Sequence, residues 1–376
     1  MLLAVTDPAV QSPPAEDLGR TFFMAGGGTG GHVIPAIAVA RELKSRGHQP
    51  VFVGTQSGFE ARLVPDAGFP LELIEIGGLK RVGLVQTVRT LRQMPLSLTK
   101  VLALFNHYRP SAIFSMGGYV AGPVVLAAWW RRLPIVVMEP NAMPGLTNRQ
   151  MGRFVTRALL SFAEAARYFP RDKTEITGLP VRREFFHIPP KTRGDVVTIL
   201  ITGGSRGSRT LNETTRDAWS FFRHSPFAVR LLHQTGGEAY DRIAKDFATS
   251  RIGGEVMPFI ADMPGAFAQA DLIVCRSGAG AVAELAAAAK PSILVPFPFA
   301  ADQHQLKNAE AFARAGAAVL VEDREMSGRR LFEEIAKLVS EPGRLERMGS
   351  QARTFAHPDA AHRAAVLLEQ LTYGRA

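Results

Sequence analysis

The sequence has 376 residues, of which 46% are hydrophobic and 21% are charged, and its mean hydropathy is +0.04. This composition excludes disordered and fibrous proteins, and the length suits two domains. The formal net charge of +10 arises between residues 21 and 182, which hold 19 Lys and Arg against 9 Asp and Glu. A basic half of this kind indicates a nucleic acid or a membrane surface as partner, unless it is an ordinary solvated surface.

The first twenty residues and the most apolar stretch predict a cytoplasmic protein. Residues 1–20 lack the basic start and long apolar run of a signal peptide, so we expect a flexible extension. Residues 112–130 contain Gly and Pro breaks that predict a strand, a loop and a helix rather than a membrane span. Cys275 is the only cysteine, which excludes a disulfide framework, and its apolar flanks predict a buried, inert strand residue.

Short apolar runs alternate with helix-like segments along the whole chain. Continuous apolar strands separated by helices are typical of parallel sheets covered on both faces, so the fold class is α/β with two doubly wound, Rossmann-like domains. We expect a first domain over residues 21–182 and a second over 183–359, with a helix at 360–376 packing back on the first. The predicted strands lie at residues 21–26, 49–54, 71–76, 111–117 and 134–139, then at 196–204, 227–236, 254–260, 271–278, 291–298 and 317–322.

Three glycine loops follow strands and precede helices. Gly26, Gly28 and Gly31 satisfy G-x-G-x-x-G, and related loops lie within residues 201–210 and 275–289. Glycine lets backbone N–H groups approach a phosphate at a helix N-terminus, although a single loop can be a mere tight turn. A dehydrogenase is the weaker hypothesis, because the second strand ends in "VFVGTQSG" without the expected carboxylate. The three loops together predict a nucleotide site between the domains.

The second domain adds groups that suit a nucleotide sugar. Glu284 follows its glycine loop by one helical turn and can accept the ribose hydroxyls, unless it is a solvated helix residue. Residues 302–308 supply amide and imidazole groups for sugar hydroxyls. The sequence has no D-x-D pair and no Cys/His cluster with metal spacing. We therefore expect no metal and no other cofactor, with helix dipoles and arginine neutralising a diphosphate.

Several motifs, in order, resemble the bacterial MurG family of UDP-N-acetylglucosamine–lipid I N-acetylglucosaminyltransferases. They are "GGGTGGHVIPAIAVA", "SMGGYVAGP", "MEPNAMPGLTN", "GLPVR", "ITGGSRGS", "PFIADM", "CRSGAGAVAE" and "ADQHQLKNA". The resemblance implies the GT-B fold. It also implies transfer of GlcNAc from UDP-GlcNAc to the MurNAc 4-hydroxyl of undecaprenyl-pyrophosphoryl-MurNAc-pentapeptide, lipid I, at the cytoplasmic face of the bacterial cell membrane. A relative with a diacylglycerol acceptor is the alternative.

The resemblance also implies roles for individual residues. Acceptor contacts fall on Gly117, Gly118 and Tyr119. Met138, Pro140 and Arg206 depart from the pattern that is common in the family. Donor contacts fall on Thr29, Gly30, Gly31, Asn141, Arg182, Ser205, Ile260, Ala279, Gly280, Ala281, Val282, Ala283, Glu284 and Gln305.

An inverting transfer needs a base for the acceptor hydroxyl. His32, at the end of the first glycine loop, is narrowly preferred, because its ordinary pKa suits neutral pH. It can equally cap the helix or bind the acceptor diphosphate. Glu139, at the end of a strand beside Asn141, is the second candidate.

The basic first half contains a candidate membrane surface. Trp129 and Trp130 precede Arg131 and Arg132, and tryptophan and cations both favour an anionic membrane interface. The alternative is a core-facing helix with a solvated basic face. A nucleic-acid-binding protein would interleave aromatics with its cations, so we expect no nucleic-acid partner. Residues 77–110 also belong to the candidate membrane surface, because apolar residues there are mixed with Lys80, Arg81, Arg89, Arg92 and Lys100.

Overall fold

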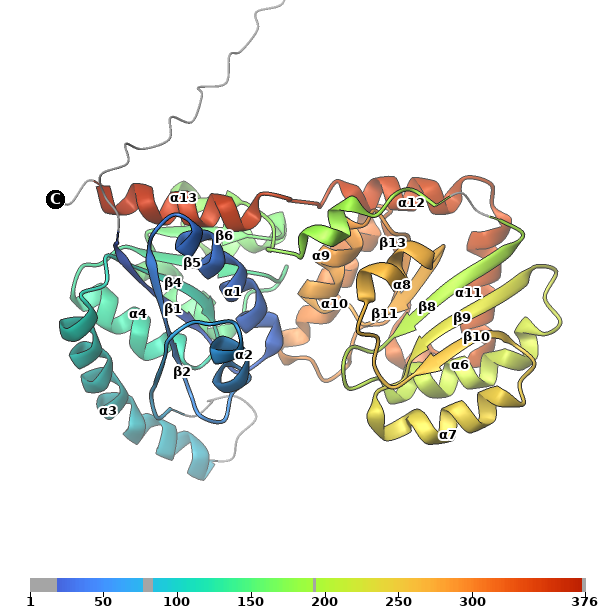
Figure 1. Ribbon diagram of the computed structural model, residues 1–376, viewed down its shortest axis with the longest axis horizontal. Helices are drawn as coiled ribbons and strands as arrows, with labels where there is room; N and C mark the ends of the chain where they lie inside the picture. Colours follow the sequence, from blue (N-terminus) through green and yellow to red (C-terminus); the bar gives the residue numbers. More distant parts are fainter. Residues whose placement is uncertain (1–18, 77–83, 192–193, 374–376) are drawn as a thin grey trace, which may run out of the picture.

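Two parallel sheets form the two lobes of the computed structural model, which describes residues 19–76, 84–191 and 194–373 (Figure 1). The first sheet has the strand order β3-β2-β1-β4-β5-β6-β7. Its strands are β1 Thr21–Gly26, β2 Gln49–Gly54, β3 Leu71–Leu73, β4 Ala112–Gly117, β5 Ile135–Glu139, β6 Arg157–Leu160 and β7 Thr174–Ile176. The helices among them are α1 Gly30–Ser45, α2 Glu60–Asp66, α3 Leu84–Tyr108, α4 Ala121–Trp130 and α5 Leu146–Met151, with 3₁₀ turns η1 Gly152–Phe154, η2 Ala163–Tyr168 and η3 Arg171–Lys173.

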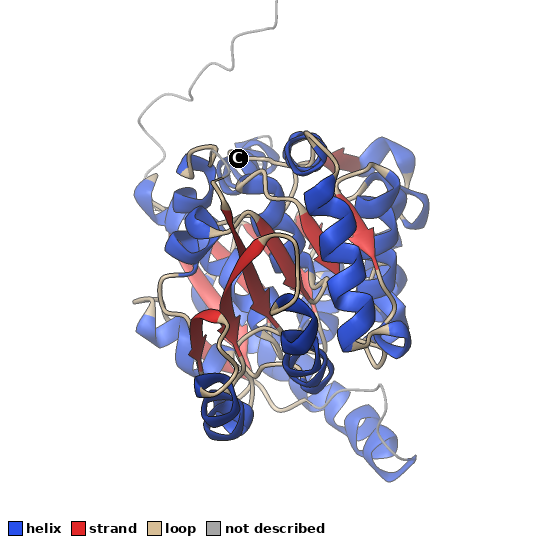
Figure 2. Ribbon diagram, turned by 90° about the vertical axis from the view of Figure 1, so that its right-hand side faces the viewer, coloured by secondary structure: helices blue, strands red, loops and turns tan. Residues whose placement is uncertain are grey.

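The second sheet has the order β10-β9-β8-β11-β12-β13, and Figure 2 shows it with helices on either side. Its strands are β8 Val196–Thr202, β9 Ala228–Gln234, β10 Gly253–Met257, β11 Leu272–Cys275, β12 Ser292–Leu294 and β13 Ala318–Leu320. Its helices are α6 Arg209–Phe222, α7 Gly237–Ala248, α8 Met263–Gln269, α9 Ala279–Ala287, α10 His304–Arg314, α11 Gly328–Ser340 and α12 Arg344–Arg353, and the 3₁₀ turns are η4 Arg183–His187, η5 Ala301–Gln303 and η6 Asp323–Glu325.

In each sheet, the direction in which successive strands are added reverses beside the first strand. β1 lies between β2 and β4, and β8 lies between β9 and β11. In doubly wound sheets, ligands bind beyond the carboxyl ends of the strands at this switch point. The topology therefore directs attention to the loops that follow β1, β4, β8 and β11.

Every strand predicted from the sequence is present, and Cys275 is buried at the end of β11, as predicted. The structure adds β6 and β7, which the sequence analysis missed, and shortens the third strand to Leu71–Leu73. β7 has three residues and ends the sheet, so it is too short to give an alternating or continuous apolar pattern.

Some predicted features lie outside the described residues. These are residues 1–18 of the predicted extension, residues 374–376 at the chain end, and Lys80 and Arg81. The side chains of Arg89 and Arg92 on α3 are also outside them. No helix within the described ranges combines the length and apolarity that crossing a bilayer requires.

The last helix, α13 Ala360–Tyr373, lies against the first domain (Figure 1). Ala364, Ala365 and Leu368 are buried in the same apolar cluster as α1. Beside them, the buried Glu369 carboxylate accepts hydrogen bonds from His48 Nε2 at 2.8 Å and from Arg46 Nη1 at 2.9 Å. Thus the chain passes from the first lobe to the second and returns, and its last helix packs on the first lobe.

Glu369→Ala is expected to lower the free energy of unfolding by about 1–3 kcal/mol, because it leaves the buried His48 N–H without an acceptor. Urea unfolding measures the effect. Glu346→Ala is the matched control, since Glu346 is exposed on α12 and its loss should change stability by less than about 0.5 kcal/mol. Equal effects of the two substitutions would contradict this role of Glu369.

Candidate active site

The first glycine loop joins β1 to α1 and is held in an unusual backbone conformation. Gly28 has φ +89°, which favours glycine, and a Cβ there would lie 2.9 Å from Tyr119 Cε1. Thr29 precedes the helix, and Gly30 and Gly31 form its first turn without any acidic residue. The loop therefore presents the N-terminus of a sixteen-residue helix, where backbone N–H groups favour an anion.

The Glu60 carboxylate holds this loop in place, a role that the sequence analysis did not predict. It is fully buried at the start of α2, and its carboxylate accepts hydrogen bonds from Gly28 N, Thr55 N and Thr55 Oγ1, each at 2.9 Å. A Cβ at Gly27 would lie 2.6 Å from Glu60 Oε1, so this glycine makes room for the carboxylate. Glu60 thus supplies the buried acceptor that the backbone of the glycine loop needs.

His32 lies in the first turn of α1 and is half-buried. Its Nδ1 is 3.2 Å from Gly27 O and 3.4 Å from Thr29 Oγ1. A carbonyl oxygen only accepts, so in the neutral ring Nδ1 carries the proton and Nε2 keeps the lone pair. Burial lowers the pKa of His32, and the nearby His304 lowers it further, against the Gly27 hydrogen bond and Glu60. The ring is therefore neutral at pH 7 and able to take a proton.

The loop after β4 packs against the first glycine loop. Gly117 and Gly118 have φ +83° and +81°, and a Cβ at Gly118 would lie 2.8 Å from Gly27 O. The hydroxyls of Tyr119 and Thr55 are 3.1 Å apart. The structure therefore brings Gly118 beside Gly27 and His32 and Tyr119 beside Gly28, whereas Gly117 lies against Asn148.

Glu139, the second candidate base, is enclosed by its own loop. It is 1% exposed at the end of β5, and burial raises the pKa of its carboxyl to about 7, against the hydrogen bonds that it accepts. Oε1 accepts from Asn141 N and Nδ2, and Oε2 accepts from Gly145 N and Asn148 Nδ2, at 2.8–3.2 Å. Both oxygens are thus committed to shaping residues 140–148. Met138, one of the departures from the family pattern, lies fully buried in the core.

The side chain of Asn308 bridges the two domains. It is fully buried on α10, and its Oδ1 accepts from Ala142 N at 2.8 Å. Its Nδ2 donates to Asn141 Oδ1 at 3.1 Å in the first domain and to Ser277 O at 3.2 Å in the second. Asn141 also donates to Glu139, so the Asn308 amide joins the loop after β5 to the second domain. The predicted contact of Asn141 with the donor competes with this bridging contact. The sequence analysis had placed Asn308 only among possible sugar contacts.

The loops of the second domain carry the remaining predicted contacts. Gly278 precedes α9, whose first turn has no acidic residue, and Ser205 is exposed in the loop after β8. The side chain of Val282 is buried in the core, so only its backbone can serve a ligand. Ile260 N is held by Gln234 Oε1 at 2.8 Å. These loops therefore offer mainly backbone groups, which carry little sequence signal.

Glu284 and Arg182 are the two charged side chains among the predicted donor contacts, and their charges interact. Burial raises the pKa of Glu284 to about 7, and the charge of Arg182 opposes this shift. Among the described residues, the Glu284 carboxylate has no hydrogen-bond partner, so it is available to accept hydroxyls. Gln305 Oε1 accepts from Phe297 N at 2.9 Å. In the part of the chain that the structure describes, no three His, Cys, Asp or Glu residues are grouped to hold a metal ion.

Two family models match the chain. The glycosyltransferase family 28 N-terminal domain matches residues 22–160, and the family 28 C-terminal domain matches residues 198–364. The first match contains β1 to β6 of the first sheet, and the second match contains the second sheet from Thr198 onward. The gap between the matches, residues 161–197, contains β7 and the segment that joins the two lobes.

Relatives match along nearly the whole chain. A protein of Solibacter usitatus named UDP-N-acetylglucosamine–N-acetylmuramyl-(pentapeptide) pyrophosphoryl-undecaprenol N-acetylglucosamine transferase is 61% identical over 93% of this chain and 96% of its own. A protein of the same name from Anaeromyxobacter sp. is 42% identical over 94% of each. The crystal structure of Acinetobacter baumannii MurG superposes with a TM-score of 0.82 at 30% identity, covering 93% of this chain and 99% of that one.

Glu60→Gln is expected to loosen the first glycine loop, because the amide replaces one acceptor oxygen by a donor that faces Gly28 N or Thr55 N. Leaving a buried donor unsatisfied costs about 1–3 kcal/mol, so amide hydrogen exchange at residues 27–29 should speed up. Asp66→Asn, at the exposed end of the same helix, is the control. Unchanged exchange in Glu60→Gln would show that the carboxylate does not hold the loop.

Proposed function

The chain belongs to the MurG family of N-acetylglucosaminyltransferases, within glycosyltransferase family 28, and from this premise we propose how its residues perform the transfer. The enzyme has the GT-B fold of two Rossmann-like domains. It transfers GlcNAc from UDP-GlcNAc to the N-acetylmuramyl unit of pentapeptide-bearing pyrophosphoryl-undecaprenol, which converts lipid I to lipid II for peptidoglycan.

His32 is the base in this proposal. Its Nε2 takes the proton of the MurNAc 4-hydroxyl while that oxygen forms a bond to C1 of GlcNAc. The bond between C1 and the β-phosphate oxygen breaks, and its electron pair leaves with UDP. Attack from the side opposite the leaving group inverts C1. The observation that carries the assignment is the Nδ1 contact with Gly27 O, which leaves the Nε2 lone pair free.

The second domain holds the donor in this proposal. The N-terminus of α9 and the guanidinium of Arg182 stabilise the negative charge that develops on UDP, and Glu284 accepts the ribose hydroxyls. The N-terminus of α1, with Thr29, Gly30 and Gly31, faces the same diphosphate from the first domain. These dipoles and the arginine take the place of a metal ion. Glu139 is a positioning residue, because both of its oxygens bind its own loop.

His32→Gln is expected to lower kcat about 10²- to 10⁴-fold while leaving the affinity for UDP-GlcNAc unchanged. Because the pKa of His32 is lowered from 6.5, its neutral form prevails at pH 7. The kcat of the unaltered enzyme should therefore fall only as the pH drops below about 6.5, and the variant should lose this dependence. The rate of UDP release with a short-chain lipid I analogue, in EDTA, measures kcat and its pH dependence.

The control for this experiment is His107→Gln, since His107 is exposed near the end of α3. A His32→Gln enzyme with near-normal kcat would refute His32 as the base. Release that stops in EDTA and returns with Mg²⁺ would refute the metal-free mechanism.

We also propose that the first domain docks on the cytoplasmic face of an anionic membrane, where its lipid-linked acceptor resides. Trp129 and Trp130, at the end of α4, are 54% and 70% exposed, and Leu96 on α3 is 72% exposed. Arg131 follows directly, and its Nη2 donates to Asn106 Oδ1 of α3. Exposed tryptophans and leucine beside arginines suit the headgroup region of a bilayer.

Arg131→Gln is expected to lower the partition onto vesicles about fivefold, because one basic residue near an anionic surface contributes about 1 kcal/mol. Trp130→Ala should also weaken binding, whereas Phe259→Ala, an exposed aromatic of the second domain, should not. Flotation with vesicles of phosphatidylglycerol and phosphatidylcholine measures the partition. Binding that ignores the anionic lipid content would refute the proposal.

A further inference from the structure

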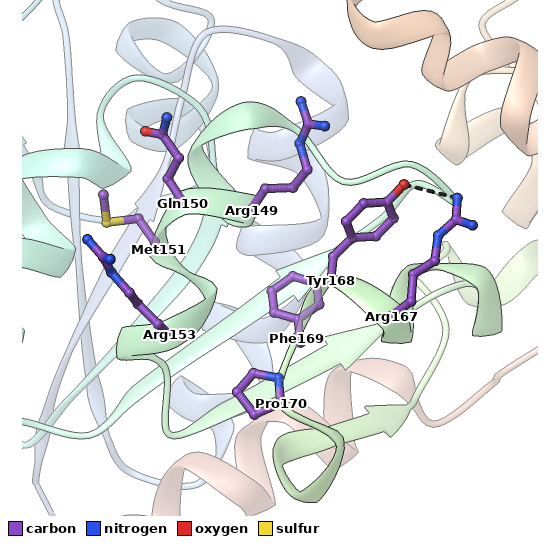
Figure 3. Close-up of a pocket in the computed structure, with 8 residues that line it drawn as sticks. All are labelled: Arg149, Gln150, Met151, Arg153, Arg167, Tyr168, Phe169 and Pro170. Atoms are coloured by element: carbon purple, nitrogen blue, oxygen red, sulfur yellow. Dashed lines mark hydrogen bonds between the residues drawn. The ribbon is translucent and has the colours of Figure 1, made fainter.

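A basic pocket of about 690 Å³ lies on the first domain, and none of the residues that line it belongs to a glycine loop. It is formed by α5, η1 and η2, and its volume is within the range of small-ligand sites. Figure 3 shows its lining, which combines three arginines with apolar side chains. The lining residues are Arg149, Gln150, Met151, Arg153, Arg167, Tyr168, Phe169 and Pro170.

The positive charge of this pocket is only partly neutralised. Arg149 Nη2 pairs with Asp302 at 3.1 Å, but its Nε is buried without a hydrogen-bond partner. Arg167 donates to the Tyr168 hydroxyl at 3.0 Å, and Arg153 lies 4.7 Å from the centre of the Phe154 ring. Among the described residues, neither Arg153 nor Arg167 has a carboxylate partner. The pocket is therefore prepared for an anionic ligand.

The arrangement of the arginines suits an extended anion. Figure 3 shows the guanidinium groups of Arg153 and Arg167 on opposite sides of the pocket, with Arg149 between them toward its upper rim. A compact diphosphate needs cations that converge on one point. Separated guanidinium groups beside the apolar side chains of Met151, Phe169 and Pro170 instead suit a short peptide with more than one carboxylate.

Residues next to the pocket arginines and their partner interact with groups of the proposed active site. Asn148, next to Arg149, donates to Glu139 at 2.8 Å. Asp302, the partner of Arg149, is two residues from His304, whose charge acts on His32. A ligand that occupies the pocket can therefore belong to the same acceptor molecule whose hydroxyl reaches His32.

We propose that the pocket of Arg149, Arg153 and Arg167 binds the carboxylates of the acceptor's pentapeptide. This inference rests on the proposed function, since relatives of this chain are named for an acceptor that carries a pentapeptide. The pocket then fixes the sugar through its peptide, while the membrane holds the lipid end.

The test compares two acceptors that share a short prenyl pyrophosphoryl-MurNAc unit. One carries the pentapeptide, and the other carries a neutral methylamide on the lactyl group. The variant is Arg153→Gln/Arg167→Gln, which spares the contact of Arg149 with Asp302, and the control is Arg41→Gln, an exposed arginine of α1. The kcat/KM ratio of the pentapeptide acceptor to the methylamide acceptor should fall about tenfold or more in the variant only.

The outcomes are distinguishable. An equal loss with both acceptors would overturn the inference and assign the pocket to the diphosphate or the membrane. Unchanged kcat/KM with both would overturn it outright, with the proposed function intact. If the unaltered enzyme transfers GlcNAc to neither acceptor, the proposed function fails, and this inference falls with it.

Discussion

The hydrogen bonds of Asn308 are the constraint on which the site depends. Its buried amide joins Asn141 and Ala142 of the first domain to Ser277 of the second. A buried amide is costly unless its groups are paired, so this contact favours one relative placement of the two domains. His32 of the first domain then lies near enough to His304 of the second domain for their charges to interact.

Buried carboxylates set the local geometry around that contact. Glu60 holds the first glycine loop, and Glu139 holds the loop that carries Asn141. Glu369 fastens α13 to the first domain. Each of them accepts hydrogen bonds from groups that are otherwise unsatisfied, which offsets the cost of burying it. The reacting groups on the surface thus rest on an inner layer of acceptors that binds no substrate in this account.

The sequence predicted the fold better than the site. Apolar strands and glycine loops have local patterns, so β1, β8 and the loops after them were foreseeable, whereas the short edge strand β7 was not. The role of Glu60 has no local signal in the sequence, because its partner Gly28 is 32 residues away and the contact forms only in the fold. The bridging role of Asn308 and the pocket of Arg149, Arg153 and Arg167 depend on contacts between distant segments, which a single sequence does not display.

The most direct test of this account is the single-turnover rate of Asn308→Ala, measured with its affinity for UDP-GlcNAc and its melting temperature. Donor binding depends mainly on the second domain in this account, so the affinity should stay close to that of the unaltered enzyme. Misplacing the reacting groups by about 1 Å can cost about 100-fold in rate, and we predict a loss of that order. A folded variant that transfers GlcNAc at the normal rate would contradict the account.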